Sequence, residues 1–245
     1  MTNFGLIGRS LSHSFSKTYF DKKFKENGLT DHNYQNFELE TIEEFKKVLA
    51  TENLRGLNIT NPYKEDIIPF LDALSPEAKE IGAVNCIKIE NNKTTGYNTD
   101  AYGFGQSIKP FLDTTHERAL ILGTGGASKA VAYSLKKIGV EIFFVSSSAK
   151  KNANTFFYNE INERVMDAFK LIINTTPLGL FPKIDESPAL PYHLFTDKHL
   201  AYDLIYNPEQ TAFLKQAKEK GAVTINGLSM LHLQAEKSWE IWSQM

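Results

Sequence analysis

The segment LNITNPYK (57–64) places polar side chains and a lysine directly after a short apolar strand. Side chains alternate along a strand, so Asn58 and Thr60 share a hydrogen-bonding face and the apolar residues take the other face. Pro62 suits the first position of a helix, which would put Lys64 in the first helical turn. A cation there opposes the helix dipole by about 0.3–1 kcal/mol. Lys64 therefore either extends into solvent or serves a site.

A carboxylate that could pair with this lysine lies in GYNTDAYG (96–103), at Asp100. An ammonium and a carboxylate about 4 Å apart interact by roughly 4 kcal/mol at an effective dielectric constant near 20, before desolvation. Such a pair suits proton transfer at a reacting oxygen. The alternative interpretations are a helix N-cap for Asp100 and a solvated side chain for Lys64. Taken singly, neither residue identifies a site.

A glycine-rich turn follows the strand in ALILGTGGASKA (119–130), with Gly123, Gly125 and Gly126 before a helix. Small residues let backbone N–H groups approach a pyrophosphate, and the helix N-terminus favours its negative charge. The third small position holds Ser128, so the motif is a variant of G-x-G-x-x-G/A. A P-loop would require glycine at that position. The sequence favours a dinucleotide site over a glycine turn that only permits close packing.

The next strand ends at Val145. The chain then continues with three serines, Ser146, Ser147 and Ser148, and two lysines, Lys150 and Lys151. Sites that prefer NAD usually carry Asp or Glu there to bond the ribose 2′-hydroxyl. Hydroxyls and nearby cations can instead accept a 2′-phosphate, which favours NADP and leaves NAD possible. The alternative interpretation is an ordinary polar loop.

Short apolar strands alternate with amphipathic helices along the chain, which is the pattern of an α/β fold. Asn91-Asn92 predicts a hairpin turn, and a change in composition at 100–105 predicts a domain boundary. The strands are expected near 3–8, 33–39, 54–60, 84–89, 93–99, 119–122, 140–145, 171–174 and 199–204, and the helices near 15–27, 41–50, 126–138 and 229–242. Thr41 and Glu44 predict a capping box at the second helix.

The composition is that of a soluble globular protein, with 245 residues, 42% apolar residues and a net charge of −2. The sequence has no stripe of basic residues of the kind that binds nucleic acid, and none of its apolar runs approaches the ~18 residues that a membrane span needs. Cys86 is the single cysteine and the histidines lack metal-ligand spacing, so no metal site is expected. We expect a cytoplasmic protein that is a monomer or a homodimer. Its expected partner is a small-molecule substrate, and we expect it to bind neither nucleic acid nor a membrane.

Eight segments, in matching order and spacing, make the chain resemble the shikimate dehydrogenase family over nearly its whole length. They are GRSLSHSFS (8–16), LNITNPYK (57–64), IGAVNCI (81–87), GYNTDAYG (96–103), LGTGGASKA (122–130), NTTPLG (174–179), YDLIYNPEQT (202–211) and GLSMLHLQA (227–235).

The resemblance implies two α/β domains that flank a cleft. Residues 1–102 and 226–245 would form the substrate-binding, catalytic domain, and residues 103–225 a Rossmann-like domain that binds NADP. The implied reaction is the reversible reduction of the 3-dehydroshikimate ketone to shikimate, within aromatic amino-acid biosynthesis.

The resemblance also implies roles for individual residues. Lys64 matches the catalytic lysine and Asp100 its paired aspartate. The implied substrate-binding residues are Ser14, Ser16 and Tyr206 for the carboxylate and Asn58, Thr60, Asn85 and Gln234 for the ring hydroxyls. The candidate cofactor-binding residues, from the glycine turn, the serines after the next strand and the matched motifs together, are Gly123, Thr124, Gly125, Gly126, Ala127, Ser146, Ser147, Ser148, Thr175 and Gly227.

This sequence departs from the family pattern at three places. Ser10 and Lys17 stand where the family usually has proline, and the serines that begin at Ser146 replace an Asn-Arg-Ser/Thr segment whose arginine grips the 2′-phosphate. Two alternatives therefore stay open. They are a quinate/shikimate dehydrogenase that uses NAD, and a ligand-binding homologue without turnover.

Overall fold

The computed structural model describes residues 1–11, 14–147 and 153–244. The chain divides into two compact units. The first unit comprises Met1–Thr99 and Ala235–Met245, and the second unit comprises Asp100–Gln234.

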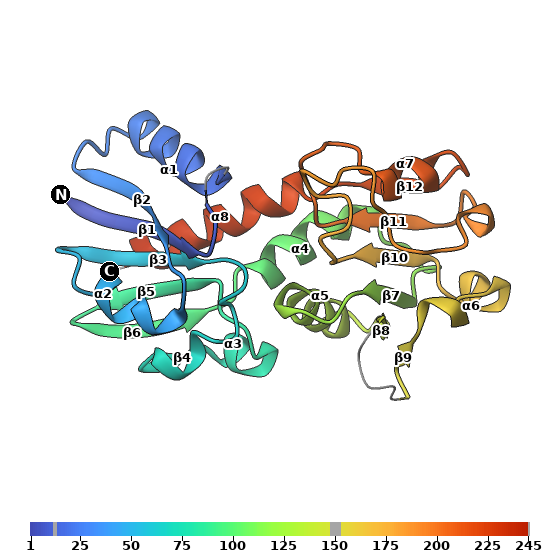
Figure 1. The fold of residues 1–245 in the computed structure, drawn as a ribbon, viewed down its shortest axis with the longest axis horizontal. Coiled ribbons are helices and arrows are strands. Elements are labelled where there is room, and N and C mark those ends of the chain that lie inside the picture. The colour runs from blue at the N-terminus through green and yellow to red at the C-terminus, as the bar shows by residue number, and fades with distance from the viewer. Residues whose placement is uncertain (12–13, 148–152, 245) are drawn as a thin grey trace. The chain divides into compact units, whose positions relative to one another are not determined.

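The first unit contains a six-stranded mixed sheet in the order β2-β1-β3-β5-β6-β4 (Figure 1). Strands β1, β2 and β3 are parallel, whereas β5 is antiparallel to both β3 and β6. The strands are β1 (Thr2–Gly8), β2 (His32–Glu38), β3 (Leu54–Ile59), β4 (Ala73–Leu74), β5 (Cys86–Glu90) and β6 (Lys93–Tyr97). The helices are α1 (Phe15–Glu26), α2 (Phe45–Val48), α3 (Pro76–Ile81) and, from Ala235, the end of α8 (Leu228–Ser243).

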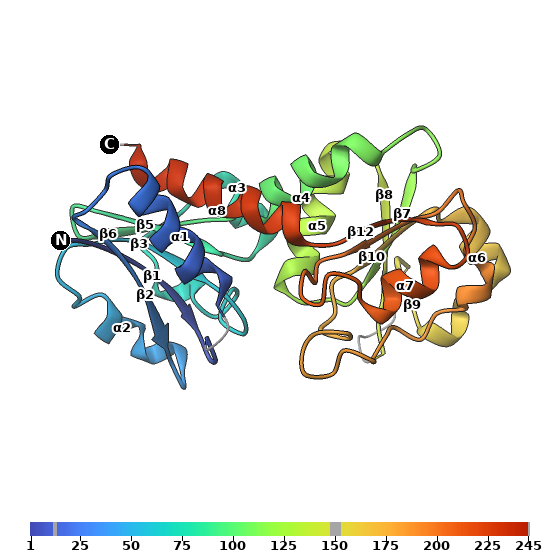
Figure 2. The same ribbon diagram turned by 90° about the horizontal axis from the view of Figure 1, so that it is seen from above.

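Each face of this sheet has its own core. Helix α1 and the end of α8 cover one face (Figure 2). There Phe20 and Phe24 of α1 pack with Trp242 of α8. The opposite face buries Leu57 and Ile59 of β3 beneath α2. Burial of one large apolar side chain stabilises a fold by roughly 1.5–3 kcal/mol. The alternation predicted for β3 is thus confirmed, since Asn58 lies on the α8 side and its neighbours on the other side.

The second unit contains six parallel strands in the order β12-β11-β10-β7-β8-β9 (Figure 1). This is the doubly wound Rossmann order, which reverses direction between β7 and β10. The strands are β7 (Arg118–Leu122), β8 (Glu141–Val145), β9 (Thr155–Phe156), β10 (Leu171–Asn174), β11 (Leu200–Asp203) and β12 (Val223–Ile225). The helices are α4 (Asp100–Ile108), α5 (Gly126–Lys137), α6 (Glu163–Ala168), α7 (Ala212–Lys218) and the start of α8.

Helices cover both faces of the second sheet, which explains why its central strands are apolar throughout. All four residues of β10 are buried. One core lies under α4 and α5, and the other lies under α6 and α7. The α/β class and the two-domain organisation predicted from the sequence are confirmed.

Most predicted elements are present, and the hairpin turn at Asn91 and Asn92 has φ values of 51° and 58°. The predicted helix 41–50 is wrong in extent, since a 3-10 turn (Ile42–Glu44) precedes the one-turn helix α2. Only half of the predicted capping box is present. Thr41 makes no side-chain cap, whereas the Glu44 carboxylate accepts from the backbone N–H groups of Glu40, at 2.9 Å, and of Thr41. No described helix is long and apolar enough to cross a membrane.

Candidate active site

The glycine turn of the second unit leaves space where a phosphate could approach the backbone. Strand β7 ends at Leu122, and Gly123 then adopts a left-handed φ of 101°. A Cβ atom on Gly123 would lie 3.0 Å from Thr175 Oγ1, so this position requires glycine. A Cβ atom on Gly125 would meet no atom of the described residues within 4 Å, and α5 begins at the next residue. The open side of the turn therefore lies at a helix N-terminus, which fits a dinucleotide pyrophosphate.

The turn is held at the point where the strand order reverses. Thr175, directly after β10, donates to the carbonyl oxygen of Leu122 from its backbone N at 3.0 Å and from Oγ1 at 2.6 Å. Gly123 N donates to the carbonyl oxygen of Val145 at 2.9 Å. The ends of β7, β8 and β10 thus form one edge, where ligands of open α/β sheets bind.

The other cofactor positions predicted from the sequence lie along the same edge. Thr124 is exposed and Ala127 is half-buried in the first turn of α5, beside Gly126. Ser146 is buried and its N–H donates to the carbonyl oxygen of Phe156 at 3.1 Å, whereas Ser147 is exposed. Ser148 lies outside the described residues.

Gly227 permits two backbones to approach closely at the start of α8. Its N–H donates to the carbonyl oxygen of Ile205 at 3.0 Å, and a Cβ atom would overlap the carbonyl group of Leu204. Leu204 N in turn donates to the carbonyl oxygen of Asn174 at 3.0 Å. Gly227 and Thr175 are therefore linked through the segment after β11.

A buried network of neutral polar groups crosses the α8 side of the first sheet. Asn58 Oδ1 accepts from the Tyr34 hydroxyl at 2.9 Å, and Asn58 Nδ2 donates to the carbonyl oxygen of Asn85 at 3.2 Å and to Ser238 Oγ at 2.9 Å. Both amide hydrogens of Asn58 are thus used within the unit. Burial raises the pKa of Tyr34, so its hydroxyl stays protonated and donates.

Asn85 belongs to the same network through Thr99. Thr99 N donates to Asn85 Oδ1 at 2.6 Å, and Asn85 Nδ2 donates to Thr99 Oγ1 at 2.9 Å. Thr99 Oγ1 also lies 3.2 Å from Ser238 Oγ. Thr99 is fully buried and directly precedes Asp100, so the network fixes the chain at the start of α4.

The prediction that Lys64 lies in the first turn of a helix is wrong. Residues 61–67 form consecutive turns, in which Tyr63 N donates to the carbonyl oxygen of Thr60 at 3.0 Å. The carbonyl oxygen of Lys64 accepts from Val84 N at 2.7 Å. The backbone is therefore fixed by a distant segment, and the unfavourable helix dipole does not arise. The Lys64 side chain is half-buried.

Ser14 and Ser16 lie at the start of α1. Ser14 Oγ is buried and has no hydrogen-bond partner in the described structure, and it does not cap α1. A buried hydroxyl without a partner costs about 1–3 kcal/mol, which a bound acceptor would remove. Ser16 forms a hydrogen bond with the Tyr34 side chain and so extends the network that contains Asn58.

Thr60 follows β3 in the first unit, where it is half-buried and its N–H donates to the carbonyl oxygen of Ile7 at 2.9 Å. Three further predicted residues belong to the second unit. Asp100 is the first residue of α4 and is buried. Tyr206 follows β11 and is half-buried, which raises the pKa of its hydroxyl. Gln234 lies on α8, where Nε2 donates to the carbonyl oxygen of Leu231 at 3.1 Å. The pairing of Asp100 with Lys64 stays a prediction.

Each unit contains buried polar residues that the sequence did not single out. They are Tyr34, Thr99 and Ser238 in the first unit and Asp203 in the second. Thr99 and Asp203 fall inside the quoted motifs, but their partners lie far away along the chain. No group of His, Cys, Asp or Glu among the described residues is arranged to hold a metal ion.

Comparison with known proteins identifies the family. The family described as the shikimate dehydrogenase substrate binding domain matches residues 6–87. A curated relative from Methanococcus aeolicus, named shikimate dehydrogenase (NADP(+)), is 40% identical over 255 residues, covering 98% of this chain and 91% of the relative. This chain belongs to the shikimate dehydrogenase family.

Solved structures of shikimate dehydrogenases and of a related enzyme share the fold. The Thermus thermophilus shikimate dehydrogenase, solved with NADP(H) and shikimate, has a TM-score of 0.87 and 32% identity, covering 100% of this chain and 94% of that chain. The Corynebacterium glutamicum quinate dehydrogenase, solved with NAD, has a TM-score of 0.87 and 26% identity over the same coverage. The resemblance read from the eight segments is thus confirmed.

Proposed function

We propose that this protein is an NADP-dependent shikimate dehydrogenase that interconverts 3-dehydroshikimate and shikimate. The observation that carries the proposal is the 40% identity, across 98% of this chain, to a relative named shikimate dehydrogenase (NADP(+)). The open glycine turn at the edge where the strand order reverses supports a dinucleotide cofactor. We assign substrate binding to the domain of residues 1–102 and 226–245, and NADP binding to residues 103–225.

In the proposed reaction Lys64 acts on the oxygen of the substrate ketone. Bound NADPH would supply the hydride that adds to the carbonyl carbon. Negative charge then develops on the oxygen, where the Lys64 ammonium stabilises it and transfers a proton to form the hydroxyl. Asp100 orients the ammonium and accepts a hydrogen bond from a neighbouring ring hydroxyl. In the reverse direction the Lys64 amine would accept the hydroxyl proton, and bound NADP would accept the hydride from the carbon.

Ser14, Ser16 and Tyr206 hold the substrate carboxylate in this proposal. The buried Ser14 hydroxyl supports that role, since it has no partner in the described part of the chain and a carboxylate oxygen would be an acceptor for it. Hydroxyl donors orient the carboxylate without placing a second charge nearby. The remaining substrate-binding residues, Thr60, Asn85 and Gln234, bind the ring hydroxyls.

We propose an indirect role for Asn58. Both of its amide hydrogens donate to groups within the first unit, to Asn85 and Ser238. Asn58 therefore fixes the positions of the segments at Asn85 and Ser238. Its Oδ1 accepts from the Tyr34 hydroxyl and can accept one more hydrogen bond, from a ring hydroxyl of the substrate.

The cofactor groups fit the edge formed by the ends of β7, β8 and β10. The pyrophosphate lies against Gly123–Ala127, with Thr124 at the exposed side of the turn, and Thr175 and Gly227 line the nicotinamide side. Ser146 and Ser147 stand where an NAD site usually has a carboxylate, and their hydroxyls can donate to a 2′-phosphate.

The second candidate is a quinate/shikimate dehydrogenase that uses NAD. It is favoured by the absence of an arginine after β8 and by the shared fold of the Corynebacterium glutamicum quinate dehydrogenase, which was solved with NAD. Steady-state kinetics with shikimate or quinate, each with NADP or NAD, separate the candidates. We expect the highest kcat/KM for shikimate with NADP. A higher kcat/KM with NAD would favour the second candidate, and no turnover with any pair would refute both.

A further inference from the structure

Asp203 is a buried carboxylate for which the proposed chemistry has no use. It ends β11, and its side chain has no exposed surface. Among the described residues no cation affects its pKa, which burial raises to about 6. A buried carboxylate without a cation is unfavourable unless hydrogen bonds satisfy it. Its presence therefore requires an explanation in terms of the groups that it binds.

Those groups come from three different segments. Asp203 Oδ1 accepts from Asn174 Nδ2 at 3.1 Å and from Ile205 N at 3.0 Å. Asp203 Oδ2 accepts from Thr211 Oγ1 at 2.6 Å. Asn174 ends β10, Ile205 begins the segment that carries Tyr206, and Thr211 caps α7. One side chain thus joins the loop after β10, the loop after β11 and the start of the next helix.

The connection continues to the glycine turn through Asn174. Asn174 Oδ1 accepts from the N–H of Thr176 at 3.0 Å and from its hydroxyl at 2.6 Å. The preceding residue, Thr175, is bonded to the carbonyl oxygen of Leu122 at the end of β7. A shift of Asp203 would therefore reach both the cofactor turn and the Tyr206 loop.

We propose that Asp203 is a positioning residue whose carboxylate sets the spacing between the cofactor loop at Thr175 and the substrate loop at Tyr206. This inference rests on the proposed function for its kinetic consequences. Asp203 contacts neither ligand in this proposal and acts through Asn174, Ile205 and Thr211. Because it joins both loops, its loss is expected to weaken cofactor and substrate binding together.

The test compares Asp203→Asn with two hydroxyl deletions in the second unit, one near each end of β11. Thr211→Val removes a donor to Asp203 at the carboxyl end of β11. Thr196→Val removes a hydroxyl of the same kind, bonded to His199 at the amino end of β11, and serves as the matched control. Thr211→Ser keeps the donor and should restore wild-type behaviour. If Asp203→Asn does not fold, Thr211→Val decides the kinetic question.

We expect Asp203→Asn and Thr211→Val to raise KM for both NADP and shikimate at least fivefold, and Thr196→Val to leave both within twofold. A solely structural role would lower the thermal midpoint and the active fraction while both KM values stayed unchanged, and that result would overturn the proposal.

Hydrogen exchange of the Thr176 and Ile205 amides gives a readout that needs no activity. Both amides should exchange at least tenfold faster in Asp203→Asn than in the wild type, and unchanged exchange would contradict the positioning role. A wild-type protein that oxidises no shikimate would refute the proposed function, while the exchange result would still decide the role of Asp203.

Discussion

The hydroxyl of Thr175 donates to the carbonyl oxygen of Leu122 at 2.6 Å, and this bond joins the ends of β10 and β7. The two strands lie on either side of the point where the strand order reverses. The bond places Thr175 over Gly123, where no side chain would fit. The same turn therefore contains one glycine needed for packing and another, Gly125, that faces open space.

The two glycines predict different results when each is replaced by alanine. Gly123→Ala places a Cβ atom in a left-handed conformation against Thr175, and should lower the free energy of unfolding by about 1–3 kcal/mol. Gly125→Ala has no neighbour to meet and should change that free energy by less than about 1 kcal/mol. Its methyl group would instead lie where the pyrophosphate approaches, so KM for NADP should rise at least tenfold. Urea denaturation and cofactor titration measure both effects, and an unchanged KM in Gly125→Ala would remove the pyrophosphate from this turn.

Ser14→Ala should separate binding from stability. Because the Ser14 hydroxyl is buried without a partner among the described residues, its removal should leave the free energy of unfolding unchanged or slightly higher. KM for shikimate should rise several-fold, since the substrate carboxylate loses a donor. The comparison is Ser16→Ala, which also breaks the bond to Tyr34 and should therefore lower stability. An unchanged KM in both variants would contradict the carboxylate role.

The buried network of the first unit predicts a large effect from a small change on α8. Ser238→Ala removes the acceptor of one Asn58 hydrogen and the neighbour of Thr99 Oγ1. Unsatisfied buried donors cost about 1–3 kcal/mol, so the free energy of unfolding should fall by that amount. Urea denaturation at fixed pH measures the change. A loss below about 0.5 kcal/mol would show that the network relaxes around the missing hydroxyl.

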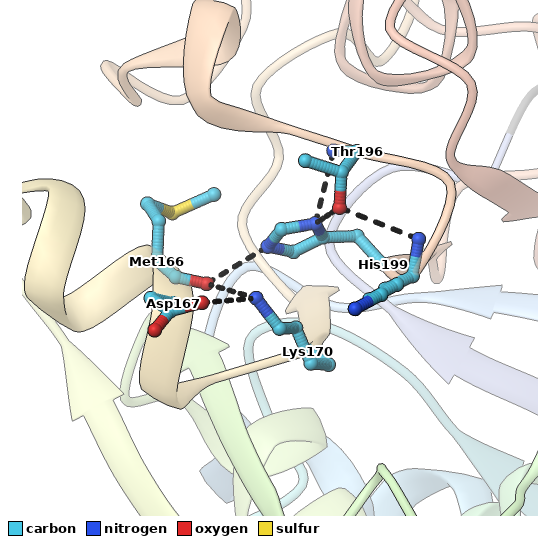
Figure 3. Close-up of polar contacts among 6 residues, drawn as sticks. Met166, Asp167, Lys170, Thr196 and His199 are labelled. Carbon is cyan, nitrogen blue, oxygen red and sulfur yellow. Dashed lines mark hydrogen bonds and ion pairs between the residues drawn. The ribbon is translucent and has the colours of Figure 1, made fainter.

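His199 makes the stability of the second unit depend on pH. Its Nδ1 accepts from Thr196 N at 3.0 Å, and Nε2 donates to the carbonyl oxygen of Met166 at 2.9 Å, so the neutral ring is the form bound (Figure 3). Burial lowers its pKa, while Lys170 opposes and Asp167 favours the charged form. A lowered folded pKa means that the His199 contribution is complete above pH 6.5 and is lost as the pH falls through the lowered value.

The corresponding measurement is urea denaturation between about pH 8 and pH 5. Between pH 8 and pH 5 the free energy of unfolding should fall more in the wild type than in His199→Gln. The difference should be about 1.4 kcal/mol for each pH unit by which folding lowers the pKa of His199. Parallel pH profiles for the two proteins would show that His199 does not titrate differently on folding.

The features predicted from the sequence are those that depend on neighbouring residues. The glycine turn, the hairpin at Asn91 and Asn92, and the alternation around Asn58 each follow from residue type and local spacing. The turn that holds Lys64 could not be predicted this way, because Val84, twenty residues later, donates to the Lys64 carbonyl oxygen. The partners of Asp203 likewise come from separate segments, since Asn174 and Thr211 meet it only in the folded sheet.

Helix α4 shows what composition alone leaves out near a domain boundary. The change in composition at 100–105 predicted that boundary, and the two units divide between Thr99 and Asp100, but the sequence did not predict that the segment itself is helical. A Cβ atom on Gly103 would lie 2.7 Å from the carbonyl oxygen of Met230. A Cβ atom on Gly105 would lie 2.5 Å from Ser134 Oγ. Both glycines serve close helix packing, and that requirement becomes visible only when α5 and α8 are in place.

The role of Lys64 is tested most directly by measuring kcat and the dissociation constant for shikimate in Lys64→Ala and Lys64→Arg. Arginine keeps the positive charge but does not release a proton at neutral pH, so it separates proton transfer from electrostatic attraction. We predict that both variants lower kcat by roughly 10²–10⁴-fold and that shikimate binding changes only a few-fold. A variant that binds shikimate much more weakly while kcat stays near the wild-type value would reduce Lys64 to a substrate anchor and contradict the account.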